Sequence, residues 1–154
     1  MERLSKSVVA KEIMTVNVFS IKKEDSLFQA ADLMADHGIS GLPVINSENH
    51  VVGIISENDF LFEMGEREKQ SFMRVIVECL KNKGCTAISL RNRTVGDIMT
   101  SPPVTVREDT SIFEIASIFE EKKINRVPVT DKDARLSGIV TRFDIVLSYC
   151  MRIT

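Results

Sequence analysis

The sequence has no tryptophan and one tyrosine among its 154 residues, so aromatic surfaces on which nucleic-acid bases stack are scarce. An excess of charge of one sign is also missing, because the formal net charge is −2 and acidic and basic residues alternate along the chain. Most nucleic-acid binders concentrate basic residues on one face. We therefore expect no nucleic-acid partner.

Long apolar runs are missing as well. None approaches the ~20 residues that a helix needs to cross a bilayer, although hydrophobic residues make up 44% of the chain and suffice for a core. Residues 1–10 lack the apolar stretch and the small-residue cleavage site of a signal peptide. These absences predict a cytoplasmic protein without a membrane partner.

Patterns of catalytic and metal-binding residues are equally scarce. The three cysteines are odd in number and have no CxxC spacing, which argues against a disulfide framework and a zinc site. His37 and His50 are too isolated for a metal site or a catalytic dyad. No Ser-His-Asp, P-loop or GxGxxG pattern occurs. We expect no catalytic residues, no metal and no enzyme activity.

The chain does contain an internal repeat. Residues 9–61 align without a gap with residues 94–146, at an offset of 85, with 12 identities in 53 positions. Only two copies occur, so the chain holds a pair rather than a solenoid array. A unit of this size buries too little surface to stand well alone. We expect the copies to pack around a pseudo-twofold axis, with clefts where their sheets meet.

Each copy is expected to form a β-α-β-β-α unit, an α/β fold of the α+β type, that opens with a short helical turn ending in Ile-Met-Thr. The patterns Ser26-x-x-Gln29 and Ser111-x-x-Glu114 predict capping boxes at the start of the first long helix. Apolar residues then recur at the helical spacing i, i+3, i+4, i+7. The expected buried stripes are Leu27, Ala30, Ala31 and Met34 in the first copy, and Ile112, Ile115, Ala116 and Phe119 in the second.

The other elements of each copy follow the same order. A brief strand precedes the helix, two strands follow it, and a closing helix begins after Ser56 and after Thr141. Gly38 and the pair Lys122 and Lys123 suit the ends of the two long helices. The expected strands are Phe19 and Ile21, Leu42–Ile45 and Val51–Ser56 in the first copy, and Val104 and Val106, Val127–Thr130 and Leu136–Thr141 in the second.

Residues 62–93 link the copies and have no counterpart elsewhere in the chain. Linkers of that length without structure are rare inside compact domains, so we expect a helix here. Its apolar face either packs on the pair or meets a second subunit. The expected stripe is Phe72, Val75, Ile76, Cys79 and Leu80, with Gly84 as the stop.

The chemically informative pattern is Gly-Ile-(Ile/Val)-(Ser/Thr)-x-x-Asp at residues 53–59 and 138–144. A glycine inside a strand lets another backbone or a ligand come close. A hydroxyl residue, free N–H groups and the helix dipole at the strand end favour an anion. A carboxylate beside them can accept both hydrogen bonds of a ribose diol. The spacing fits such a ligand site and an ordinary helix cap equally well.

These motifs resemble the CBS domain, named after cystathionine β-synthase, and their duplication resembles a Bateman module. The resemblance covers about two-thirds of the chain and indicates a stand-alone CBS domain-containing protein: repeat 1 at 9–61, a helical linker at 62–93 and repeat 2 at 94–146. It depends on the Ile-Met-Thr openings at 13–15 and 98–100, the x-Pro-Val segments at 42–44 and 127–129, and the glycine signatures at 53–59 and 138–144.

The resemblance implies a regulatory module that binds AMP, ADP, ATP or S-adenosylmethionine between the repeats, without an obligate cofactor. The signature aspartates would contact ribose, the hydroxyl residues ribose or phosphate, and the backbone of the opening segments adenine. A basic residue before x-Pro-Val would reach phosphate. The implied ligand-binding residues are Thr141, Asp144, Arg126, Val18, Phe19, Ser56, Asp59, Pro103 and Val104.

The two copies are not equivalent at the position of this basic residue. Arg126 in the second copy is matched by Gly41 in the first. We therefore expect the site of Thr141, Asp144 and Arg126 to be the better anion binder, the alternative for Arg126 being a solvated surface side chain. The resemblance also implies a homodimer and a regulated protein partner. The alternative function is a structural dimerisation or protein-interaction module whose clefts stay empty.

Overall fold

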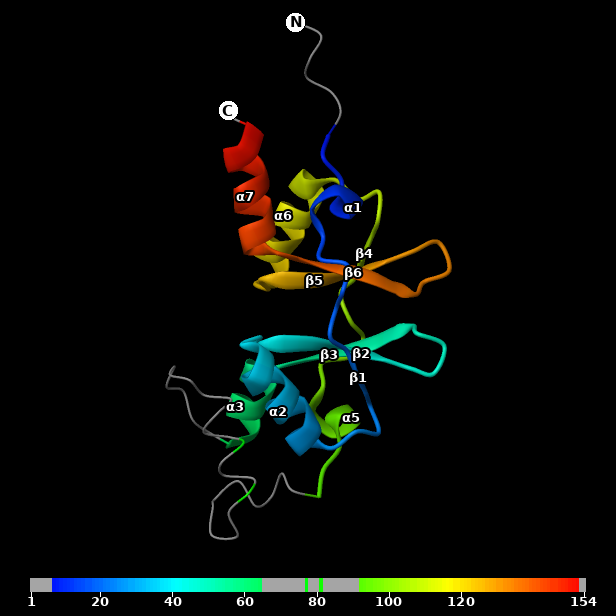
Figure 1. Cartoon of the computed structure of the whole chain (residues 1–154), viewed down its shortest axis with the longest axis vertical. Coiled ribbons are helices and arrows are strands. Elements are labelled where there is room, and N and C mark those ends of the chain that lie inside the picture. Colours follow the sequence, from blue (N-terminus) through cyan, green and yellow to red (C-terminus); the bar gives the residue numbers. More distant parts are fainter. Residues whose placement is uncertain (1–6, 65–76, 78–80, 82–91, 153–154) are drawn as a thin grey trace, which may run out of the picture. The chain divides into compact units, whose positions relative to one another are not determined.

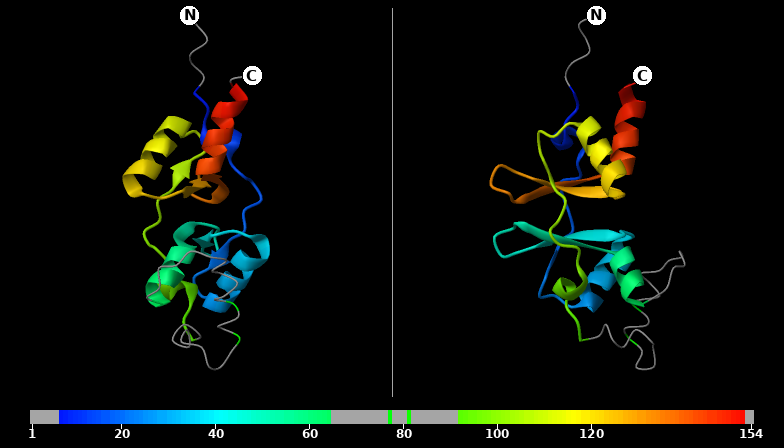
Figure 2. Two further views of the ribbon diagram at one scale, coloured as in Figure 1. Left: turned by 90° about the vertical axis from the view of Figure 1, so that its left-hand side faces the viewer. Right: turned by 180° about the vertical axis from the view of Figure 1, so that it is seen from behind.

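The computed structural model describes residues 7–64, 77, 81 and 92–152, which divide into two compact units. Unit 1 comprises Met1–Val18, Asn49–Val51 and Val104–Thr154, and unit 2 comprises Phe19–Glu48 and Val52–Pro103. Each unit contains a three-stranded sheet with helices on one of its faces (Figures 1 and 2). The predicted mixed α/β fold is therefore confirmed.

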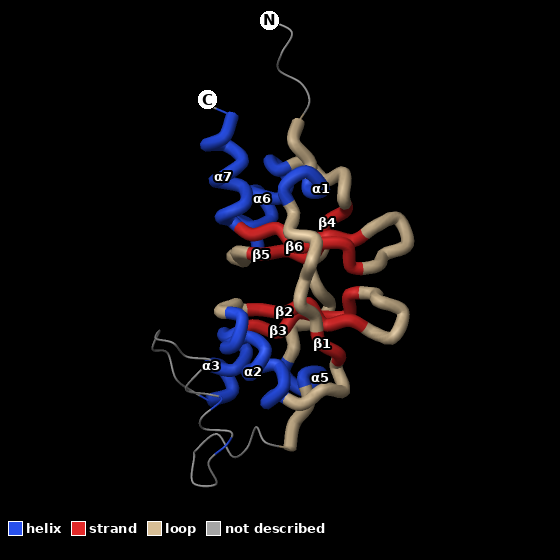
Figure 3. Tube along the Cα trace, viewed as in Figure 1, coloured by secondary structure: helices blue, strands red, loops and turns tan. Residues whose placement is uncertain are grey.

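The same succession of elements occurs in both halves of the chain (Figure 3). The first sheet has the order β1-β2-β3, with β1 parallel to β2; the second has the order β4-β5-β6, with β4 parallel and β6 antiparallel to β5. The elements are α1 (Ala10–Ile13), β1 (Ile21–Lys22), α2 (Leu27–His37), β2 (Gly41–Ile45), β3 (Val51–Ser56), α3 (Glu57–Met64), α5 (Val95–Ile98), β4 (Val106–Arg107), α6 (Ile112–Lys122), β5 (Arg126–Thr130), β6 (Leu136–Thr141) and α7 (Arg142–Arg152).

The two short opening helices are exchanged between the repeats. Helix α1 precedes the first repeat's sheet in sequence, yet Ala10 is fully buried in the core of unit 1, and its N–H donates to Thr110 O at 2.8 Å. Helix α5 opens the second repeat, yet Val95 is fully buried in the core of unit 2, and its N–H donates to Asp25 O at 2.9 Å. Each compact unit thus combines segments of both repeats.

The long helices α2 and α6 form for the predicted reasons. The Gln29 N–H donates to Ser26 Oγ at 3.1 Å and the Ser26 N–H donates to Gln29 Oε1 at 2.8 Å, which completes the first capping box. Ser111 Oγ accepts the Glu114 N–H at 3.2 Å, but among the described residues the return bond of the second box is not formed. The predicted stripes are buried, except that Ala116 is only partly so.

The helix ends are also as expected from the sequence. Gly38 follows α2 in the left-handed conformation with φ 61°, which glycine adopts without steric cost. Its counterpart Lys123 follows α6 with φ 54°, a conformation that costs a residue with a Cβ about 1 kcal/mol or more. The lysine side chain carries the positive charge that favours the C-terminus of a helix.

Two expectations need correction or fall outside the structure. Phe19 and Val104 were expected inside the opening strands but lie ahead of β1 and β4, which begin at Ile21 and Val106. Those strands have only two residues each because pairing starts where Ile21 meets Val44 and Val106 meets Val129. The predicted stripe of the linker lies outside the described residues, apart from the neighbouring Val77, which is fully buried in the core of unit 2.

Candidate functional site

The candidate site of each unit begins where its last strand passes into a helix. At the end of β3, the Ser56 N–H and Oγ donate to Asp59 Oδ2 at 2.8 and 3.3 Å. At the end of β6, the Thr141 N–H and Oγ1 donate to Asp144 Oδ2 at 2.7 and 3.0 Å. Both aspartates therefore do cap the helix that follows the strand. A ligand can bind only to those acceptor positions of each carboxylate that no hydrogen bond of the protein already occupies.

The signature glycines make room for the opening segment of the other repeat. A Cβ at Gly53 would lie 2.6 Å from Met99 Sδ and 3.1 Å from Thr100 O. A Cβ at Gly138 would overlap Met14 Sδ and lie 2.9 Å from Thr15 O. Of the two approaches that the sequence left open for these glycines, the structure shows that of another backbone.

Hydrogen bonds fix each opening segment against its signature strand. Thr100 N–H donates to Ile54 O at 2.8 Å and Ile54 N–H donates to Thr100 O at 3.0 Å. The corresponding bonds of Thr15 with Ile139 are 2.9 and 3.0 Å. The exchange therefore places a Met-Thr segment of one repeat beside the signature strand of the other.

Thr100 is a residue of the site that sequence reasoning missed. Its Oγ1 donates to Asp59 Oδ1 at 3.1 Å. Burial raises the pKa of the Asp59 carboxyl, and the hydrogen bonds from Ser56 and Thr100 oppose that rise. The available signal was the Met-Thr segment itself, which recurs in both repeats and opens each one.

Asp144 has a different set of donors. Its Oδ2 receives both bonds from Thr141, whereas Oδ1 receives none from the residues that the structure describes. Asp144 is half-buried in the first turn of α7. This oxygen is the free acceptor at the site.

The predicted adenine-contacting residues fall in different units. Val18 belongs to unit 1 with Thr141 and Asp144, and Pro103 belongs to unit 2 with Ser56 and Asp59. Val18 and Pro103 thus lie in the unit that holds the signature of the other repeat, whereas Phe19 and Val104 lie with the signature of their own. Phe19 is assigned to unit 2, where its exposed ring stacks on His37 with centroids 3.9 Å apart, and Val104 is assigned to unit 1.

The predicted phosphate-binding residue lies beside the signature of its own repeat. Arg126 is paired with Thr141 across β5 and β6, and its Nε donates to Asn125 Oδ1 at 3.2 Å. The matching Gly41 is buried at the start of β2 and brings no charge. At this position the second repeat therefore carries a positive charge and the first carries none.

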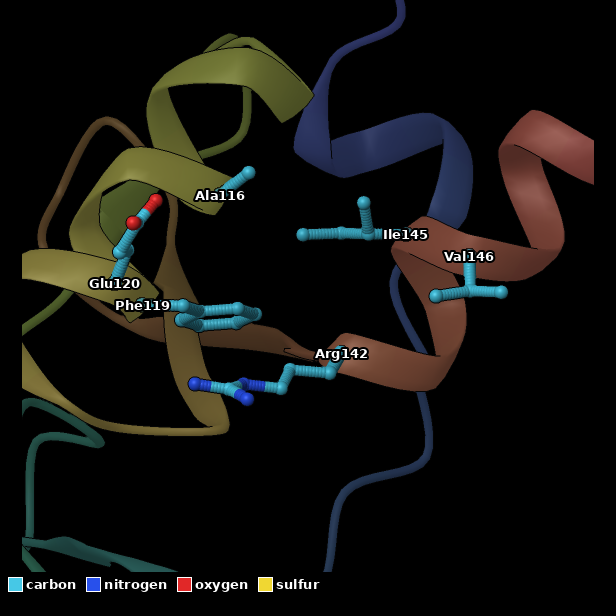
Figure 4. A pocket seen from close by; sticks show the side chains of 6 residues that line it. All are labelled: Ala116, Phe119, Glu120, Arg142, Ile145 and Val146. Carbon is cyan, nitrogen blue, oxygen red and sulfur yellow. The ribbon is translucent and has the colours of Figure 1, made fainter.

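Unit 1 also has a groove of about 310 Å³ between α6 and α7. Phe119 and Glu120 from α6 line one side, and Arg142, Ile145 and Val146 from α7 line the other (Figure 4). Phe143 is 70% exposed and Val146 57% exposed on the same helix. Large exposed apolar side chains gathered on one helix are typical of an interaction surface.

Two further features of the described residues bear on function. Within residues 7–64, 77, 81 and 92–152, no three His, Cys, Asp or Glu side chains are grouped so that they could hold a metal ion. In the same part of the chain, no helix combines the length and the apolar character that crossing a membrane requires.

The repeated sheet-and-helix unit with a Ser/Thr-x-x-Asp helix start defines a class of small, duplicated α/β domain. The CBS-domain family model matches residues 10–66 and 95–149, so the chain belongs to the CBS-domain family and carries two copies of it.

Proteins and solved structures that are similar to this chain support the same family assignment. The CBS domain-containing protein CBSX1 of Arabidopsis thaliana chloroplasts is 32% identical over 87% of this chain and 63% of its own length. CBSX2 in complex with AMP is 29% identical, with a TM-score of 0.73, over 95% of this chain and 98% of that one. The CBS pair of protein MJ0100, in complex with 5-methylthioadenosine and S-adenosyl-L-methionine, is 25% identical, with a TM-score of 0.69, over 92% and 99%. The chain thus spans less than two-thirds of CBSX1.

Proposed function

We propose that this protein is a regulatory CBS pair that binds an adenosyl compound, with the half-site of Thr141 and Asp144 as the stronger one. The observation that carries the proposal is the open Asp144 Oδ1 beside the N-terminus of α7. Support comes from the ligands of similar CBS pairs, which are AMP for CBSX2 and 5-methylthioadenosine with S-adenosyl-L-methionine for MJ0100.

The two hydroxyl donors of a ribose match the acceptor positions that are open on the Asp144 carboxylate. An ionised carboxylate offers about four acceptor positions on its two oxygens. Thr141 occupies two of them, both on Oδ2, so two remain for the two hydroxyl groups of a ribose diol. Hydrogen bonds to a charged acceptor contribute about 1.5–3 kcal/mol each.

The base and the phosphate have their own candidate contacts. The backbone carbonyl of Val18 lies in the same unit as Asp144 and is the acceptor offered to the adenine amino group, since the Val18 N–H donates to Val16 O at 3.0 Å. Arg126, opposite Thr141 in the sheet, supplies the cation for a phosphate group. AMP, ADP, ATP and S-adenosylmethionine share the adenosyl group, and the proposal covers this class without an obligate cofactor.

Binding would regulate by shifting a conformational equilibrium. A ligand changes the arrangement of a protein only as far as it binds one arrangement more tightly than another. The regulated protein partner and a cytoplasmic location remain part of this proposal, and catalysis does not.

Thermal unfolding in the presence of AMP, ATP or S-adenosylmethionine tests the proposal. A ligand at 100 times its Kd stabilises the folded state by about 2.7 kcal/mol, which raises the Tm of a chain of this size by roughly 5–10 °C. Guanosine monophosphate serves as the control ligand, since it keeps ribose and phosphate but changes the base. An unchanged Tm with all three adenosyl compounds at millimolar concentration would overturn the proposal.

The alternative function, a dimerisation module, is favoured by a separate observation. Helices α6 and α7 expose Phe113, Phe143, Val146 and Leu147, and the groove between the two helices is lined by Val146, with Glu120 on one side and Arg142 on the other. A twofold contact must be self-complementary. The opposite charges of Glu120 and Arg142 meet this condition, so we propose a second copy of this chain as the occupant.

Light scattering after gel filtration tests the dimer. Val146→Asp buries a charge in the proposed contact and is expected to convert dimer to monomer. The control is Ala134→Asp, which adds the same charge at an exposed turn of unit 1 where φ is 61° and Asp is tolerated. A monomeric wild type, or a Val146→Asp variant that stays dimeric, would contradict this contact.

A further inference from the structure

The two signature aspartates differ in the number of hydrogen bonds that they accept from other residues of the protein. Asp59 accepts three hydrogen bonds, two from Ser56 on Oδ2 and one from Thr100 on Oδ1. Asp144 accepts two, both on Oδ2. A carboxylate has about four acceptor positions, so Asp59 has one unoccupied position and Asp144 has two. A ribose diol, which donates two hydrogen bonds, needs two unoccupied positions.

The Thr100 hydroxyl is held in place by the segment that carries it. Both backbone bonds between Thr100 and Ile54 fix the residue against β3. The next residue adds a bond, since Ser101 Oγ donates to the Val52 carbonyl oxygen at 3.2 Å. The whole Thr100–Ser101 segment is therefore anchored to the strand that leads to Asp59.

The matching segment of unit 1 lacks this second anchor. Thr15 makes the same backbone bonds with Ile139, but the residue after it is Val16, which has no hydroxyl group and is 66% exposed. Within the described part of unit 1, no hydrogen bond joins Thr15 to Asp144. The unit with Ser101 is therefore the one whose aspartate, Asp59, accepts the additional hydrogen bond, and the unit with Val16 is the one whose aspartate, Asp144, does not.

We propose that Thr100 is a specificity-determining residue that occupies Asp59 in place of a ribose hydroxyl and so excludes vicinal diols from this half-site. This inference rests on the proposed function, because it takes an adenosyl compound as the ligand. It makes the half-site of Ser56 and Asp59 weak for two independent reasons, since Gly41 also supplies no cation. One molecule of AMP is bound per chain at the other half-site.

Titration calorimetry with AMP tests the role of Thr100. The wild type is expected to bind one AMP per chain, and Thr100→Ala is expected to bind a second. The affinity of the second site for AMP should be at least about tenfold higher in Thr100→Ala than in the wild type, because the variant regains one hydrogen-bond acceptor. Thr100→Ser keeps the hydroxyl and is expected to behave as the wild type. Thr15→Ala is the matched control and is expected to leave the stoichiometry at one.

The outcomes separate this inference from the proposed function. A double variant, Thr100→Ala with Asp144→Ala, should retain one AMP, which assigns the second molecule to Asp59. If the wild type binds one AMP and Thr100→Ala also binds only one, the role of Thr100 is overturned while the proposed function stands. Two equal sites in the wild type overturn it as well. No AMP binding by any variant overturns both.

Discussion

Asp144→Ala is expected to weaken AMP binding by at least about 100-fold. The change removes the acceptor of both ribose hydroxyl groups, and two bonds to a charged acceptor are together equivalent to about 3 kcal/mol or more. It also removes the bonds from the Thr141 N–H and Oγ1 to the carboxylate, at 2.7 and 3.0 Å. The measurement is titration calorimetry, with the Tm of each variant taken in parallel.

Asp59→Ala is the matched control for this prediction. Asp59 occupies the same position of the other repeat and accepts the same two bonds from Ser56. Loss of the cap therefore costs a comparable amount in both variants, about 0.5–2 kcal/mol. Only Asp144→Ala should lose the ligand. Equal AMP affinity in the wild type and Asp144→Ala, or a greater loss in Asp59→Ala, would contradict the assignment of the stronger half-site.

Gly138→Ala is expected to destabilise the fold by about 1–3 kcal/mol, the usual cost of forcing extra atoms into a packed site. A Cβ at this position would overlap Met14 Sδ and lie 2.9 Å from the backbone oxygen of Thr15. The sulfur is the flexible end of a side chain and can move aside. The oxygen cannot, because it accepts the Ile139 N–H at 3.0 Å.

Chemical denaturation of three variants measures this effect and identifies its source. Gly53→Ala should cost less than Gly138→Ala, since its Cβ would lie 3.1 Å from the equivalent oxygen of Thr100. Adding Met14→Ala to Gly138→Ala should not restore wild-type stability, because the backbone contact remains. A neutral Gly138→Ala would show that α1 and the Met14–Thr15 segment do not pack on unit 1 in solution.

The long helices could be predicted because their signals are local. The stripe that begins at Leu27 repeats over two turns, and the cap of Ser26 lies three residues from its partner Gln29. The strands after α2 and α6 likewise start and end within one residue of their expected bounds. Such features need no knowledge of the rest of the fold.

The exchange of α1 and α5 could not be predicted in this way. Each is a helix of only four residues, and its pattern does not say which sheet it will cover. Tertiary packing decides that, through contacts such as Val95 with the core of unit 2. Periodicity therefore predicted the elements of the repeats but not the composition of the compact units.

The local pairing of residues in the candidate site could be predicted for the same reason as the long helices. Ser56 with Asp59 and Thr141 with Asp144 are neighbours in sequence, and the structure joins both pairs. Thr100 lies 41 residues from Asp59 and meets it only because the opening segments are exchanged. The sequence predicted unequal candidate sites from Arg126 and Gly41; that Asp59 accepts one hydrogen bond more than Asp144 could be learned only from the structure.

Amide NMR spectra during an AMP titration report binding and its location together. If the stronger half-site is that of Thr141 and Asp144, the Val18, Thr141 and Asp144 amides will show saturable shifts, with smaller changes at Ser56 and Asp59. Unchanged Val18, Thr141 and Asp144 amides at millimolar AMP, or saturable shifts at Ser56 and Asp59 instead, would contradict this assignment.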